Sequence, residues 1–130
     1  MASIFTKIIQ RQIPAHIIAE DEQCIAFLDI MPLTMGHTLI VPKVEEDYIF
    51  DLEDSTFTRL NLFAKKVSKA IRKATGCKRM GVAVLGMEVP HAHIHLVPMN
   101  NMSDMNFANP KLKLSNEQLA DMAEQIRKSF

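Results

Sequence analysis

The chain has 130 residues, of which 48% are hydrophobic and 23% are charged, which is typical of a folded globular protein and not of a disordered one. Fifteen basic and fifteen acidic residues give a formal net charge of +0, so no overall field draws the chain to nucleic acid or to an anionic membrane. No apolar run approaches the roughly 20 residues that cross a bilayer, and we expect a single domain over residues 1–130 with neither nucleic acid nor membrane as a partner.

The cysteines and the first residues bear on the cellular compartment. Cys24 and Cys77 stand far apart and form no C-x-x-C pair, so they indicate reduced thiols and not a disulfide framework. The first residues lack the long apolar core and the cleavage site of a secretory signal. The expected location is therefore the cytoplasm.

Hydrophobic periodicity predicts the first elements. Ile4, Phe5, Ile8 and Ile9 have the spacing of a short amphipathic helix, which ends before Pro14. Short runs of apolar and β-branched residues, bounded by turn residues, then predict strands. The expected strands are residues 15–19, 24–30, 37–41, 80–85 and 93–97.

Two further helices complete the expected fold. The longest apolar stripe of helical period predicts a helix over residues 55–75, which Gly76 is placed to end. Ser115 and Gln118 have the spacing of a capping box at the start of a last helix. One long helix, short terminal helices and a mostly antiparallel five-stranded sheet define an α+β fold.

The most informative stretch holds three of the five histidines of the chain. His91, His93 and His95 are each separated by one apolar residue. On a strand, this alternation places the three imidazoles on one face, roughly 6.5–7 Å apart, while the apolar residues pack behind them. Burying three imidazoles in a row is unfavourable without a task, so the pattern favours a functional site.

Residue types alone leave two chemistries open. Two histidines in an H-x-H pair can bind one zinc ion, with Glu88 or His37 as a further ligand. Alternatively, a neutral imidazole can attack phosphorus, while neighbouring imidazoles set its tautomer, bind the phosphate and protonate a leaving group.

The H-x-H-x-H pattern followed by two apolar residues resembles the signature of the histidine-triad (HIT) superfamily of nucleotide hydrolases and transferases. Further blocks occur in the same order and are similar to the Hint branch of that superfamily. These blocks are residues 3–9, 13–15, 20–22, 26–30 and 36–43. The resemblance runs from about residue 3 to residue 99, and it implies a HIT-like fold and a homodimer.

The resemblance implies a role for each histidine. His93 is the expected nucleophile, which forms a histidyl-nucleotide intermediate that water resolves. His95 is expected to hydrogen-bond the α-phosphate and to support departure of the leaving group. His91 and His37 are expected to orient and polarise their neighbours.

The resemblance also implies a nucleotide site. Asp29 is expected to accept hydrogen bonds from the ribose hydroxyls. The segment that contains Gly86 and Glu88 is expected to lie by the α-phosphate and the leaving group. The expected walls of the base pocket are Ile4, Phe5, Ile8 and Ile30.

The implied activity is that of a purine nucleoside phosphoramidase that releases AMP or GMP. Hydrolysis of a dinucleoside polyphosphate is the nearest competing activity, because it uses the same nucleophile. A nucleotide-binding protein without catalysis and a metalloprotein are two further hypotheses that the residues leave open.

The chain departs from the family pattern in two places. Residues 84–90 form a shorter loop than usual, with Met87 where Gln is usual and Glu88 where Ser or Thr is usual. Ser3 and Thr6 replace the C-x-x-C that some bacterial relatives use for zinc, and Val44-Glu45 replaces a common histidine position. These replacements predict that the protein binds no metal, and we expect no cofactor.

Overall fold

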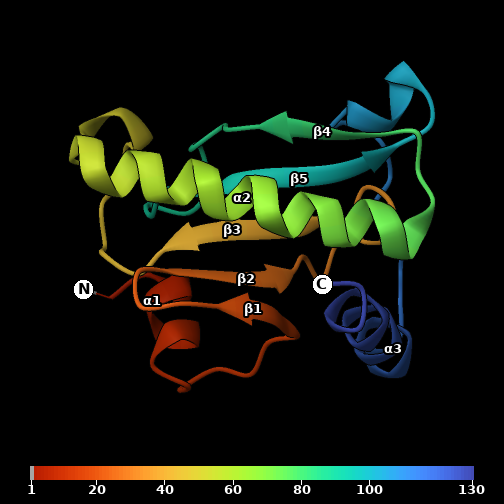
Figure 1. Cartoon of the computed structure of the whole chain (residues 1–130), viewed down its shortest axis with the longest axis horizontal. Coiled ribbons are helices and arrows are strands. Elements are labelled where there is room, and N and C mark those ends of the chain that lie inside the picture. The colour runs from red at the N-terminus through yellow and green to blue at the C-terminus, as the bar shows by residue number, and fades with distance from the viewer. Residues whose placement is uncertain (1) are drawn as a thin grey trace.

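The computed structural model describes residues 2–130 (Figure 1). Within this range, one five-stranded sheet has the order β1-β2-β3-β5-β4, with every neighbouring pair antiparallel. The strands are β1 Ile17–Glu20, β2 Cys24–Leu28, β3 Thr38–Pro42, β4 Arg79–Ala83 and β5 Ile94–Met99. The helices are α1 Ile4–Ile9, α2 Asp54–Thr75 and α3 Asn116–Arg127, with 3-10 turns η1 Ile49–Asp51 and η2 Met102–Met105. The expected α+β class with a mostly antiparallel sheet is confirmed.

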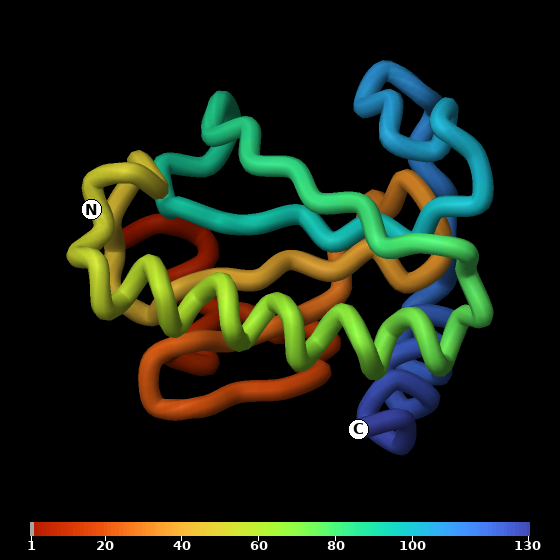
Figure 2. The backbone as a smooth tube through the Cα atoms, turned by 45° about the horizontal axis from the view of Figure 1, so that its top comes forward, coloured from red at the N-terminus to blue at the C-terminus, as the bar shows by residue number. Residues whose placement is uncertain are grey.

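The two faces of the sheet carry different hydrophobic clusters. On one face, α2 and α3 pack against alternate residues of the central strands, such as Ala26, Ile40 and Ile94. On the other face, Phe5 and Ile8 of α1 pack against Ile25, Phe27, Leu39 and Val41. Figure 2 shows the long α2 running along the sheet, with the blue C-terminal helix at one end of it. The period of two in a strand therefore sends successive side chains of β2 and β3 into separate cores.

The helix ends follow the expected capping chemistry. Gly76 ends α2 with a left-handed φ of 70°, a conformation that glycine adopts without strain. Ser115 and Gln118 form the expected capping box of α3. Ser3 caps α1 by accepting a hydrogen bond from the Thr6 N–H. Among the helices of residues 2–130, none combines the length and the apolar character that a membrane crossing requires.

The expected strand at residues 93–97 is displaced, which is the main correction. It starts at Ile94 and runs to Met99, so His91 and His93 precede the strand instead of lying on it. The physical reason is that the preceding N–H groups bond elsewhere: His91 N–H donates to the Val89 carbonyl and Ala92 N–H to the Glu46 carbonyl. The ladder with β3 begins only at Ile94.

The other bounds differ by a few residues. β2 ends at Leu28, two residues before the expected end, so Asp29 and Ile30 lie in the loop that follows it. β4 likewise ends at Ala83, where its pairing with β5 stops. Both cysteines are buried and free.

Candidate active site

Four of the five histidines gather at the face of the sheet that α1 covers. His37 directly precedes β3, His91 and His93 lie in the loop before β5, and His95 lies within β5. All four are buried, with relative exposures of 0–9%. The centre of the His95 ring lies 4.9 Å from the ring centre of His93 and 5.2 Å from that of His37. The Phe5 ring of α1 meets His93 edge-on at 4.9 Å. The expected meeting of His37 with the three clustered histidines is therefore present.

Backbone carbonyls set the tautomers of His91 and His93. His91 Nε2 lies 2.8 Å from the Pro42 carbonyl oxygen, and His93 Nδ1 lies 2.8 Å from the His91 carbonyl oxygen. A carbonyl can only accept a hydrogen bond, so both of these nitrogens carry the proton. In the neutral ring of His93, the lone pair is consequently on Nε2. This nitrogen is the one available to act as a base or a nucleophile.

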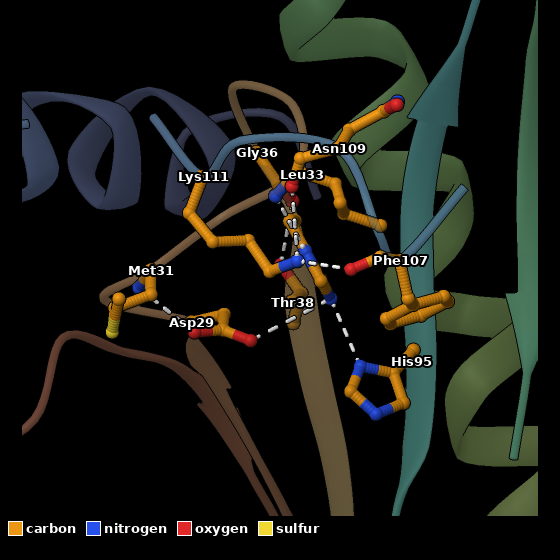
Figure 3. Close-up of polar contacts among 10 residues, drawn as sticks. Asp29, Met31, Leu33, Gly36, Thr38, His95, Phe107, Asn109 and Lys111 are labelled. Carbon is orange, nitrogen blue, oxygen red and sulfur yellow. Dashed lines mark hydrogen bonds and ion pairs between the residues drawn. The ribbon is translucent and has the colours of Figure 1, made fainter. Parts of the chain in front are cut away.

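The tautomers of His37 and His95 follow from a backbone donor. Leu33 N–H donates to His37 Nδ1 at 3.0 Å, so in the neutral ring the proton of His37 is on Nε2. His37 Nε2 lies 3.0 Å from His95 Nδ1, a contact drawn as the dashed line to His95 in Figure 3, and because His37 Nε2 carries the proton it is the donor. His95 Nδ1 is then an acceptor, and His95 Nε2 carries the proton. His95 can therefore donate a hydrogen bond to a ligand.

Burial keeps these rings neutral. Desolvation lowers the pKa of His37 to about 3, with further lowering by the nearby His95 and Lys111. Desolvation also lowers the pKa of His95 to about 4, helped by the nearby His93. The pKa of His91 is lowered by burial as well. At neutral pH, His37 and His95 are thus uncharged and hold the tautomers described above.

Asp29 joins this group from the loop after β2. One carboxylate oxygen accepts a hydrogen bond from Met31 N–H at 2.9 Å, and the other lies 3.7 Å from His37 Nε2 (Figure 3). Burial raises the pKa of Asp29, and the nearby charge of Glu88 raises it further, while Met31 N–H, His93 and Lys111 oppose the rise. The second oxygen of Asp29 is placed to accept a hydrogen bond from a ligand.

The histidine and aspartate cluster could in principle hold a metal ion. Asp29, His37 and His95 offer ligand atoms that lie within 4.8 Å of one another. A histidine that binds a metal through one nitrogen carries its proton on the other, which normally donates to an acceptor. Leu33 N–H, a donor, occupies that position at His37. Moreover, no buried side-chain nitrogen or oxygen of residues 2–130 lacks a hydrogen-bond partner. The arrangement suits proton donation better than metal binding.

A second polar cluster surrounds His91 at the start of α1. Ser3, Thr6 and Glu45 lie together with His91, and their oxygen atoms hydrogen-bond one another and the imidazole. Serine and threonine hydroxyls are not among the cysteine, histidine and carboxylate ligands of structural zinc sites. Only His91 and Glu45 of this cluster are of the types that bind zinc, so the four residues do not make up a closed four-ligand zinc site.

The residues expected around the base differ in their environments. Phe5 and Ile8 are buried in the cluster between α1 and the sheet, and Phe5 also contacts His91 and His93. Ile4 and Ile30 are largely exposed, at 49% and 66%. The structure therefore brings Phe5 to the histidines, whereas Ile4 and Ile30 present apolar surface to solvent.

A cavity of about 450 Å³ opens beside His93. Its lining is mostly apolar and includes Tyr48, Phe50 and Met87, together with the expected residue Gly86. Glu88 is exposed and is not among the lining residues, although its charge reaches Asp29. The altered loop thus presents apolar groups to the space next to His93.

Sequence reasoning missed two residues of this site. The Phe107 ring lies 5.0 Å from His95 and 6.2 Å from His37, measured between ring centres. Lys111 Nζ donates to the Phe107 and Asn109 carbonyls, and its side chain extends between Asp29 and Phe107 in Figure 3. Both residues lie in irregular chain after η2, where no periodic pattern marks a buried side.

The structure is thus an α+β fold in which an open antiparallel sheet carries a cluster of buried histidines on one face. Residues 10–102 match the HIT domain, so the chain belongs to the HIT family. This confirms the family resemblance.

Three similar proteins illustrate the range of the family. An uncharacterized HIT-like protein of Borreliella burgdorferi is 33% identical and covers 95% of this chain and 94% of its own. The adenosine 5′-monophosphoramidase of Saccharomyces cerevisiae is 37% identical and covers 75% of this chain and 62% of its own. A HIT-like protein of Bartonella henselae has a solved structure with a TM-score of 0.86 and 29% identity, covering 98% of this chain and 96% of its own.

Proposed function

We propose that this protein is a nucleotide hydrolase that attacks the α-phosphorus with His93, and that it acts as a purine nucleoside phosphoramidase releasing AMP or GMP. One observation carries the proposal. The hydrogen bond from His93 Nδ1 to the His91 carbonyl leaves the Nε2 lone pair free in a neutral ring. An imidazole held in this tautomer is a suitable nucleophile for covalent catalysis.

The four histidines divide the reaction between them. His93 Nε2 forms a bond to the α-phosphorus, and the bond from phosphorus to the leaving nitrogen breaks. The leaving amine takes the proton of His95 Nε2. Water next attacks the phosphorus of the histidyl-nucleotide, and the bond from phosphorus to His93 Nε2 breaks. The proton that the water loses returns to His95 Nε2, so the nucleoside monophosphate is released and both histidines are restored. His37 supports this role of His95, because its hydrogen bond to His95 Nδ1 directs the proton of His95 to Nε2.

The nucleotide is held by groups around the histidines. Asp29 accepts hydrogen bonds from the ribose, and Ile4, Phe5, Ile8 and Ile30 contact the base. Gly86 and the apolar cavity beside His93 adjoin the leaving group. The name of the yeast relative, an adenosine 5′-monophosphoramidase, supports the choice of a phosphoramidate as substrate.

The test is a substrate panel with wild type and His93→Ala. The panel contains adenosine and guanosine phosphoramidates, a diadenosine polyphosphate and adenylyl sulfate. Wild type is expected to prefer a phosphoramidate. His93→Ala should lose turnover while its nucleotide affinity stays within about tenfold, which corresponds to roughly 1.4 kcal/mol. His16→Ala, which removes an imidazole outside the cluster, is the matched control.

The other outcomes of the substrate panel would identify a different function for this protein. A preference for the diadenosine polyphosphate identifies a dinucleoside polyphosphate hydrolase, and tight nucleotide binding without turnover identifies a binding protein. A His93→Ala variant that keeps a tenth or more of the wild-type kcat refutes the covalent role. Denaturing a reaction of labelled substrate should trap the nucleotide on wild type and not on His93→Ala.

We also propose that the protein is a cytoplasmic homodimer that pairs through the free edge of β4. This strand lies at the end of the sheet, where its outer backbone groups have no strand partner within residues 2–130. Val82 on β4 is 65% exposed, and an apolar side chain on an open strand edge is normally covered. Light scattering with wild type and Val82→Lys tests this proposal, since the added charges should favour the monomer.

A further inference from the structure

A hydrogen-bonded cluster joins α1 to the loop that carries His91. Glu45 Oε1 accepts hydrogen bonds from Ser3 N–H at 2.7 Å and from Thr6 Oγ1–H at 2.5 Å. Ser3 Oγ accepts a hydrogen bond from Thr6 N–H at 3.0 Å and lies 2.7 Å from His91 Nδ1. These residues come from α1, from the segment after β3 and from the histidine loop, so the cluster connects three distant parts of the chain.

The direction of each hydrogen bond in the cluster follows from the Pro42 carbonyl. His91 Nε2 gives its proton to that carbonyl, so His91 Nδ1 in the neutral ring is an acceptor. Ser3 Oγ–H is consequently the donor to His91, and Thr6 Oγ1–H is the donor to Glu45. Thr6 Oγ1 also lies 3.3 Å from Ser3 Oγ and 3.4 Å from His91 Nδ1, so these assignments follow the shorter contact of each hydroxyl. The cluster ends at the imidazole of His91.

The cluster reaches the nucleophile through the backbone of His91. The ring of His91 is held on both sides, by Ser3 and by Pro42, and its carbonyl accepts the proton of His93 Nδ1. Ser3 and His91 are 7% and 0% exposed, so water has little access to replace a lost hydrogen bond between them. A displacement of His91 would thus move the acceptor that sets the tautomer of His93.

We propose that Ser3, Thr6 and Glu45 are positioning residues, which hold His91 in one orientation and thereby fix the reactive tautomer of His93. The inference rests on the proposed function, because it assigns a purpose to the tautomer of His93.

The first test separates positioning from helix capping. Ser3→Gly removes the hydroxyl but keeps an acceptable N-cap, whereas Ser3→Thr keeps both. We expect Ser3→Gly to lower kcat about tenfold with KM within twofold, and Ser3→Thr to restore most of the loss. Because Glu45 is exposed and water can partly replace it, Glu45→Ala should lower kcat only about threefold. Glu45→Gln keeps the acceptor oxygen and should behave as wild type. Glu22→Ala, at an exposed acidic residue in the β1–β2 turn, is the matched control.

The second test does not depend on activity. Nitrogen chemical shifts of the imidazoles report the tautomers directly, and wild type should show protonated Nδ1 at His93 and protonated Nε2 at His91. Ser3→Gly should give a mixture of His93 tautomers, while Ser3→Thr should not. An unchanged His93 tautomer in both Ser3→Gly and Glu45→Ala overturns the inference. Absence of turnover by wild type on every substrate, with the tautomers as expected, overturns the proposed function instead.

Discussion

Acidification should destabilise this protein strongly, because two buried imidazoles resist protonation. The pKa of His37 is about 3 and that of His95 about 4, against about 6.5 in an unfolded chain. Below pH 6.5, the unfolded state therefore binds protons that the folded state does not. The free energy of unfolding therefore decreases as the pH is lowered below 6.5. The decrease stops near the pKa that each ring has in the folded protein.

The size of the effect at pH 5 is nearly independent of how far the folded pKa is lowered. Both folded values lie below 5, so both rings stay neutral in the folded protein at that pH. At pH 5 the solution is 1.5 pH units below the unfolded pKa. Lowering the pH from 7 to 5 therefore reduces the free energy of unfolding by about 2 kcal/mol for each histidine. Together the two rings account for about 4 kcal/mol, a large part of the stability of a typical domain.

The assay is denaturant unfolding of wild type, His37→Asn and His95→Asn at pH 7 and at pH 5. Each variant should be less stable than wild type at pH 7, since it loses the hydrogen bond between the two rings. The informative quantity is the difference between the two pH values, which should shrink by about 2 kcal/mol in each variant. Most carboxylates remain ionised at pH 5, so they contribute little to this difference. If both variants lose as much stability as wild type, the two rings are not held neutral by burial.

Two further predictions concern charged residues near the proposed nucleotide site. Lys111→Met removes a positive charge whose field lowers the pKa of Asp29, and it should weaken nucleotide binding about fivefold by calorimetry. Lys113→Met, at an exposed lysine, should leave the affinity unchanged. Glu88→Ser should raise kcat/KM for a dinucleoside polyphosphate relative to a phosphoramidate with a basic leaving group, through about 1–2 kcal/mol less repulsion. Because Glu88 is exposed, the change should shrink at high salt, and an unchanged ratio at low salt contradicts a role toward the leaving group.

Local patterns account for most of the fold. The apolar stripe of α2 and the capping residues Gly76 and Ser115 predict their helices closely, because periodicity and caps are properties of neighbouring residues. The start of β5 is less predictable. The Ala92 N–H bonds to the distant Glu46 carbonyl, and no local pattern indicates that partner.

The candidate site likewise contains some residues that the sequence predicts and others that it does not. The histidines and Asp29 stand in recognisable motifs, so their meeting could be expected from the family resemblance. Phe107 and Lys111 reach the site from irregular chain after the last strand, where only the tertiary path decides which side chain turns inward. The environment of Glu88 likewise depends on the course of a loop. This residue does not line the cavity next to His93.

The backbone partners of the histidines explain how one residue type can serve opposite purposes within a few ångströms. His91 and His93 each donate to a carbonyl, which leaves a lone pair on the opposite nitrogen. His37 accepts from the Leu33 N–H, which puts its proton on the nitrogen that faces His95. Reversing one of these partners would exchange donor and acceptor along the row without changing any side chain. The reactivity of the site therefore depends on the positions of Pro42, Leu33 and the His91 carbonyl as much as on the histidines themselves.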